Sequence, residues 1–181
     1  SPDDIARFIL GTKSETLARL ESRVQRSHIG KQVNFTCEQW RGDSKAVLQG
    51  IAHTFSGANL IVRSSSKAED GWFSSNAGGF ESLLNIDGEE HAAIHKAIEV
   101  VIASYGEQGD SQDQVLVQEF LAGVRAAGVV FTCSLETGAP YYRFNFDDKT
   151  HSTESVTAGT HGGLRTVVAS RFATEHLNEV E

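Results

Sequence analysis

Side chains suited to binding phosphate are concentrated over residues 63–70, which read RSSSKAED. Arg63 follows the apolar run Leu60–Val62 and precedes three serines, and the glycine pair Gly78–Gly79 comes later in the same stretch. A guanidinium presents a permanently charged fork to oxyanions, while hydroxyls and glycine amides supply neutral donors at close range. The pattern predicts a strand that delivers phosphate-binding groups into a glycine-rich loop. The alternative is a strand that ends in a solvated turn.

Helix and strand patterns alternate around this segment and must position it. Thr12 and Glu15 have the spacing of a capping box, which predicts that a helix begins there. Apolar residues at helical spacing predict helices over about 13–27, 43–55, 89–105 and 164–177. Short apolar or alternating runs predict strands over 32–36, 60–63, 80–86, 115–117, 128–132 and 140–146, with a hairpin turn at 136–140. This order of elements predicts an α/β or α+β sandwich.

The composition limits the classes of partner. The chain has 181 residues, 39% of them hydrophobic, which is enough for one core or for one core and a small subdomain. Its net charge of -8 argues against a partner that is nucleic acid or an anionic membrane, because binders of those show a basic face. No segment approaches the roughly 20 apolar residues of a membrane span. Two cysteines, Cys37 and Cys133, and the lack of a secretory signal predict a cytoplasmic protein.

The two ends of the chain suggest a piece of a longer protein. The chain begins Ser1-Pro2, contains no methionine, and stops at Glu181 inside a helix-like pattern. A domain that closes on itself usually ends at a turn or a frayed tail. We expect residues 1–181 to form a single fragment whose C-terminal part is missing, and any division into subdomains to fall near 113–121.

The segment Leu60 to Asn85, LIVRSSSKAEDGWFSSNAGGFESLLN, carries a family resemblance. It resembles the signature of the N-terminal nucleotide-binding domain of phosphoenolpyruvate synthase, pyruvate phosphate dikinase and their relatives. Downstream, Val115–Gln118 and Gly128–Thr132 occur in the order and approximate spacing of that family. Upstream, Gly11-Thr12-Lys13 is similar to the family's opening, which normally has two glycines before the lysine. The resemblance extends over about residues 10 to 135.

This resemblance implies an ATP-grasp-like α+β fold, with mixed sheets flanked by helices, in which two subdomains close on ATP and Mg²⁺. Lys13 and Arg63 would stabilise the transferring phosphates, which is the catalytic role. A lysine such as Lys13, taken alone, is most often a surface residue near a helix start. The further contacts to ATP implied by the resemblance are Ser64, Ser65, the loop Ala77, Gly78 and Gly79, the adenine-binding backbone of Gln118, Glu119, Phe120 and Leu121, and the Thr132 hydroxyl.

The chain also departs from the family pattern. The family's magnesium-binding acid and glutamine are expected beyond residue 181, so the chain itself carries no predicted metal ligand. Its phosphohistidine domain and its phosphoenolpyruvate/pyruvate domain are separate, and both are expected as partners in the parent chain. Where dikinases have a glycine-leucine-glycine-glutamate stretch, residues 145–148 read Asn-Phe-Asp-Asp, which indicates a divergent branch.

The function implied by the resemblance is the ATP-binding portion of a phosphotransferase that moves phosphoryl from ATP to a histidine on another domain. Two other hypotheses stay open. The chain could be a non-catalytic nucleotide-binding or structural module, as the altered segment after Asn145 suggests. It could also be the ATP domain of a related kinase with a different acceptor.

Overall fold

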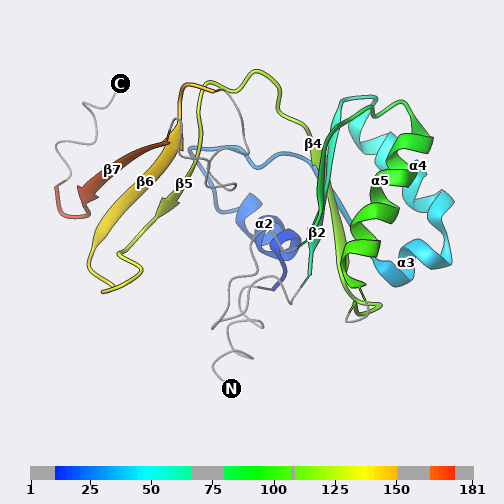
Figure 1. The fold of residues 1–181 in the computed structure, drawn as a ribbon, viewed down its shortest axis with the longest axis horizontal. Coiled ribbons are helices and arrows are strands. Elements are labelled where there is room, and N and C mark those ends of the chain that lie inside the picture. Colours follow the sequence, from blue (N-terminus) through cyan, green and yellow to red (C-terminus); the bar gives the residue numbers. More distant parts are fainter. Residues whose placement is uncertain (1–10, 67–79, 107–108, 151–163, 174–181) are drawn as a thin grey trace. The chain divides into compact units, whose positions relative to one another are not determined.

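The computed structural model describes residues 11–66, 80–106, 109–150 and 164–173 (Figure 1). It divides into two compact units, Ser1–Phe120 and Leu121–Glu181. Each unit has its own antiparallel sheet, and the two are described separately.

The first unit is built on a four-stranded sheet in the order β1-β4-β2-β3. Figure 1 shows α3, α4 and α5 on one face of this sheet and α2 on the other. In chain order the elements are α2 (Lys13–Glu21), β1 (Gln32–Thr36), α3 (Cys37–Gly42), α4 (Ser44–Phe55), β2 (Leu60–Ser65), β3 (Ser82–Ile86), α5 (His91–Ser104) and β4 (Gln114–Glu119).

The hydrophobic core lies between the sheet and helices α3 to α5. Successive side chains of a strand point to opposite faces, so every second residue of β2 and β4 enters this core. The fully buried members from these strands are Leu60, Val62, Val115 and Val117. The intervening residues of β2 and β4 therefore point to the opposite face of the sheet, where α2 lies.

Polar side chains cap the starts of α2, α3 and α4. Thr12 and Glu15 form the expected capping box at α2, and Thr36 and Gln39 form a second one at α3. The Asp43 side chain accepts from the Ala46 N–H and begins α4. The short helix α3 was not expected from the sequence. The helix expected over 13–27 ends earlier, at Glu21, because little apolar packing holds its last turn, where Leu20 is 41% exposed.

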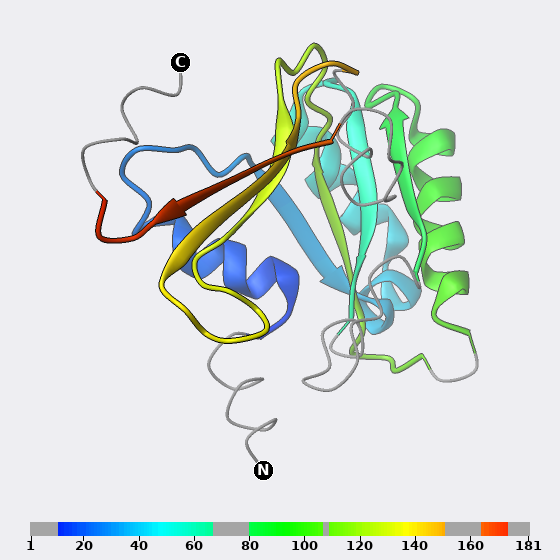
Figure 2. The ribbon, with the colours of Figure 1, turned by 60° about the vertical axis from the view of Figure 1, so that its left-hand side comes forward.

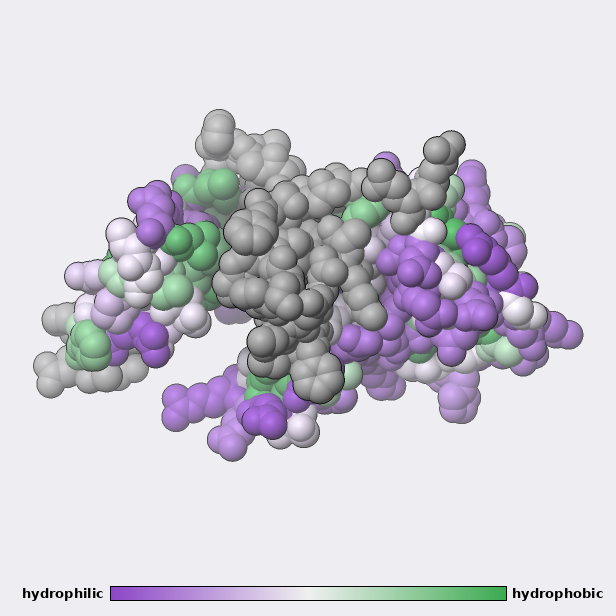
Figure 3. Space-filling view, turned by 90° about the horizontal axis from the view of Figure 1, so that it is seen from below, coloured by the Kyte–Doolittle hydropathy of each residue, from purple (hydrophilic) through white to green (hydrophobic). Residues whose placement is uncertain are grey.

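The second unit is a three-stranded sheet in the order β5-β6-β7 (Figure 2). Its strands are β5 (Ala127–Phe131), β6 (Tyr141–Asp147) and β7 (Leu164–Ser170). The hairpin predicted between 128–132 and 140–146 is confirmed by the pairing of β5 with β6. Several hydrophobic side chains of this unit are exposed, among them Val130 and Val168, and Figure 3 shows hydrophobic side chains in green on this unit.

The helix predicted over 164–177 is wrong where the structure describes it. Residues Leu164–Ser170 form β7, which pairs with β6 along its whole length, from Leu164 opposite Asp147 to Ser170 opposite Tyr141. The run Thr166-Val167-Val168 is β-branched and packs well on a pleated surface, so the available partner strand decides against the helix. Residues 174–177 lie outside the described residues.

The α+β fold class is confirmed by this arrangement. In one respect the sheets differ from the expectation, since every pairing between described strands is antiparallel and the sheets are not mixed in direction. A short connection such as the one from β5 to β6 can join only antiparallel strands. Among the described helices, none is both long and apolar enough to cross a membrane.

Candidate functional site

The face of the first sheet that bears α2 is predominantly polar. The pairing register sets Arg63 opposite Leu116, and Leu116 opposite Asn34. Two residues further along β2, Ser65 pairs with Gln114. Because directly paired residues point to the same side, these side chains share one face with their neighbours two positions away. We call this the polar face and define it by Gln32, Asn34, Arg63, Ser65, Gln114 and Gln118.

Arg63 lies in the middle of the polar face, between Leu116 on β4 and Ser82 on β3. Its Nε is buried and has no hydrogen-bond partner among the described residues. Leaving a charged donor desolvated without an acceptor costs free energy, and natural proteins seldom tolerate it without a reason. The arrangement can therefore receive an oxyanion.

The first turn of α2 lies against the end of β2. Lys13 is the first residue of α2, and the Ser14 N–H next to it donates to Ser65 Oγ at 3.2 Å. Ser14 is completely buried, while Lys13 is half-buried. The structure thus brings the lysine and arginine segments together on one side of the sheet, although they are far apart in the sequence.

The three serines after Arg63 do not act as a single group. Ser65 points to the polar face, whereas Ser64 pairs with Val115 and faces the helices, where it is buried. Ser66 Oγ bonds Asp113 Oδ1 at 2.7 Å. Of the two serines predicted to contact ATP, the structure sets only the Ser65 side chain on the Arg63 side.

The segment predicted to bind adenine begins on the polar face and leaves it. Gln118 lies diagonally across from Arg63, a separation of roughly 7–8 Å for such positions. Glu119 pairs with Leu60 and points to the opposite face. The Phe120 N–H donates to the Asn59 carbonyl at 2.7 Å, so that donor is already used.

The other predicted contacts belong to the second unit or lie outside the described residues. Leu121 and Thr132 belong to the second unit, where Leu121 is exposed and Thr132 directly follows β5. Ala77, Gly78 and Gly79 lie outside the described residues.

Sequence reasoning missed four members of this site: Gln32 and Asn34 of β1, Gln114 at the start of β4, and Ser14 of α2. Gln114 Oε1 accepts from Ser14 Oγ at 2.7 Å and from Thr12 Oγ1 at 2.9 Å. For Gln32 and Asn34 the available signal was the alternation of polar and apolar residues in Gln32–Thr36, which marks a strand with one polar face.

Residues 38–170 match the family model described as "Pyruvate phosphate dikinase, AMP/ATP-binding domain". The match covers well over half of the 181 residues. The chain belongs to this family. Arg63 and Gln118 lie within the matched segment, whereas Lys13 and the rest of α2 precede it. A comparison with curated proteins gave no match.

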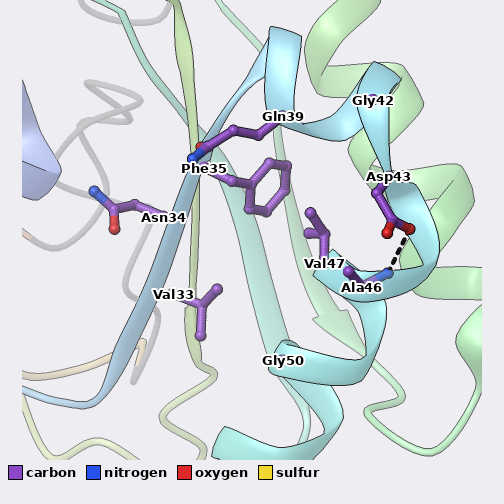
Figure 4. Close-up of a pocket in the computed structure, with 9 residues that line it drawn as sticks. All are labelled: Val33, Asn34, Phe35, Gln39, Gly42, Asp43, Ala46, Val47 and Gly50. Carbon is purple, nitrogen blue, oxygen red and sulfur yellow. Dashed lines mark hydrogen bonds between the residues drawn. The ribbon is translucent and has the colours of Figure 1, made fainter.

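The dikinase-type AMP/ATP-binding domain also has a cavity away from Arg63. It has a volume of about 530 Å³ and lies between β1 and the helices α3 and α4. Figure 4 shows Val33, Phe35 and Val47 pointing into it, while Asn34 points the other way. Its lining contains no cation. This cavity therefore offers no positive charge to a phosphate, whereas the polar face carries the guanidinium of Arg63.

The described part of this dikinase-type domain offers no group of three or more His, Cys, Asp or Glu side chains that could hold a metal ion. The residues of the polar face supply amides, hydroxyls and a guanidinium, which suit phosphate oxygens better than a divalent cation. No step is assigned to a magnesium ion held by these residues.

The two free thiols of the dikinase-type domain are expected to react at very different rates. Burial raises the pKa of the Cys37 thiol, and this side chain is 2% exposed, whereas Cys133 is only half-buried. Because the thiolate is the nucleophile, iodoacetamide at pH 8 should alkylate Cys133 first and Cys37 only on unfolding. Peptide mass spectrometry measures this, with a sample in denaturing urea as the control. Equal rates in the folded chain would contradict the expectation.

Proposed function

We propose that the polar face binds the phosphates of ATP and that Arg63 is its principal contact. The single observation that carries the proposal is the buried Arg63 Nε, which lacks an acceptor among the described residues. Its place within the matched segment supports the same assignment. The chain as a whole is acidic, with a net charge of -8, so a bound polyanion needs such local cations.

In this proposal each group has a defined task. Arg63 binds phosphate oxygens with two parallel donors, and Lys13 supplies a second charge from the start of α2. Neutral donors of Ala77, Gly78 and Gly79 complete the phosphate contacts, and the Ser64 hydroxyl is left out of them because it is buried on the helical face. The remaining free backbone groups of Gln118–Leu121 bind the adenine edge, and the fold we propose is of the ATP-grasp type.

The activity we propose is that of the ATP-binding portion of a phosphoenolpyruvate synthase or pyruvate phosphate dikinase-like phosphotransferase. ATP, with Mg²⁺ as its counterion, would be positioned so that a histidine on another domain of the parent chain receives the phosphoryl group. In phosphoryl transfer most catalysis is positioning and electrostatic stabilisation, which Arg63 and Lys13 supply. The free thiols Cys37 and Cys133 suit a reducing compartment, and we place the protein in the cytoplasm.

A second candidate function is nucleotide binding without transfer. It is favoured by residues 145–148, Asn-Phe-Asp-Asp, which run from the last three residues of β6 into the turn after it. Asp147 there is fully buried and accepts from the backbone N–H groups of Lys149 and Thr150. Its carboxylate is thus used to fix a turn. A variant of the main proposal is that this chain is the ATP domain of a related kinase that transfers phosphoryl to a different acceptor.

Isothermal titration calorimetry of the 181-residue chain with Mg-ATP and with AMP tests the proposal. We expect saturable binding of ATP and weaker binding of AMP, because AMP offers fewer oxygens to Arg63 and Lys13. Arg41→Ala is the control for the general loss of a positive charge. It removes an exposed arginine of α3 and should leave ATP affinity unchanged. No binding of ATP, or equal affinity for ATP and AMP, would count against phosphate recognition by the polar face.

A further inference from the structure

We infer that a buried polar junction fixes the relative position of Lys13 and Arg63, an inference that rests on the proposed function. The junction consists of Thr12, Ser14, Ser65 and Gln114. Gln114 Oε1 accepts from the hydroxyls of Ser14 and Thr12, and Ser65 Oγ accepts from the Ser14 N–H. Ser14 and Ser65 are fully buried and Thr12 is 3% exposed.

The junction lies beside both proposed phosphate-binding cations. Lys13 is flanked in the chain by Thr12 and Ser14, and Arg63 is two residues before Ser65 on the same face of β2. The bonds between Ser14 and Ser65 connect segments 51 residues apart. Any movement of α2 relative to β2 would change the separation of the two charges and must break these bonds.

A residue from the helical face, Tyr105, also bonds the end of β2 and the start of β4. The Ser65 N–H donates to the Tyr105 hydroxyl at 3.3 Å, and that hydroxyl donates to the Gln114 carbonyl. Tyr105 follows α5 and is 6% exposed. Ser65 and Gln114 are therefore held by their side chains on the polar face and through their backbones on the helical face.

The chemistry of the contact suits positioning better than general helix docking. A helix that packs only for stability buries an apolar stripe, yet the buried residue of α2 is Ser14, while Leu20 is substantially exposed. Hydrogen bonds add little net stability but demand defined distances and angles. The Ser65 hydroxyl is fully buried and already bonded to Ser14, so we assign it a positioning role, and ATP would contact Arg63 and Lys13.

The test is to replace each junction serine and compare ATP with AMP. Ser65→Ala and Ser14→Ala should each weaken ATP binding about tenfold, since ATP must reach both cations. AMP affinity should change less than about twofold, because one phosphate engages only one of them. The matched control is Ser104→Ala, which removes a half-buried hydroxyl of α5 that donates to Val101 O. Calorimetry gives the affinities, and thermal melting checks the fold.

The outcomes separate this inference from the proposed function. If both serine variants bind ATP as the unmodified chain does, while Arg63→Met loses ATP, the junction does not position the cations and the proposed function stands. If the unmodified chain binds no ATP, the proposed function fails and the inference falls with it. An equal loss of ATP and AMP, or failure of both serine variants to fold, would show a purely structural junction and overturn the inference. Should only Ser65→Ala fail to fold, Ser14→Ala gives the decisive result.

Discussion

Arg63→Met should remove most of the affinity for ATP and yet leave the folded chain at least as stable as before. A hydrogen bond to a charged group contributes about 1.5–3 kcal/mol, so the loss of the guanidinium should weaken ATP binding roughly 10- to 100-fold. Stability should behave differently, because the buried Nε has no protein partner among the described residues. Methionine removes an unsatisfied donor and keeps most of the apolar stem.

Two measurements on the same variant check both parts of this prediction. Calorimetry with Mg-ATP gives the affinity, and urea denaturation gives the free energy of unfolding. Arg63→Lys is the matched variant, since it keeps the charge but loses the planar fork. Its ATP affinity should lie between that of the unmodified chain and that of Arg63→Met. A marked loss of stability in Arg63→Met would mean that Arg63 serves the fold, and unchanged ATP affinity would remove it from the phosphate site.

Ile98→Ala should destabilise the first unit by about 2–5 kcal/mol. Ile98 is fully buried in the core between α5 and the sheet. Truncation removes apolar contacts and leaves a cavity that well-packed neighbours fill only in part. Since small domains are stable by only about 5–15 kcal/mol, this single change removes a large share of the total.

Val100→Ala is the control for the core prediction. Val100 lies on the same helix but is 37% exposed, and alanine is the better helix former, so stability should change by less than about 0.5 kcal/mol. Urea denaturation followed by far-UV circular dichroism measures both variants. Similar effects for Ile98→Ala and Val100→Ala would contradict the placement of the core on one face of α5.

Local patterns in the sequence were sufficient for most of the first unit. The run Leu60-Ile61-Val62 predicted β2 because a short apolar segment bounded by polar turns is typical of a buried strand. The spacing of Thr12 and Glu15 predicted the start of α2 because a capping box satisfies backbone donors locally. Both features depend on neighbours in the chain and need no knowledge of the fold.

The features that the sequence did not predict depend on distant partners. The apolar residues Leu164, Val167 and Val168 fit either a helix or a strand, and only pairing with β6 decides between them. Arg63 and Lys13 were predicted as site residues by motif, but the register that sets Arg63 diagonal to Gln118 is a property of two strands far apart in the chain.

The capping box at α3 has a consequence for self-association. β1 is an edge strand of its sheet among the described strands, and unpaired backbone groups at such an edge can recruit a strand from another molecule. Here the Thr36 N–H at the end of β1 donates to Gln39 Oε1 at 2.8 Å. The helix that follows the strand thus occupies one of its backbone donors with a side chain of its own. The hydrogen bond that caps α3 therefore also leaves fewer free backbone groups on β1 to which a strand of another molecule could pair.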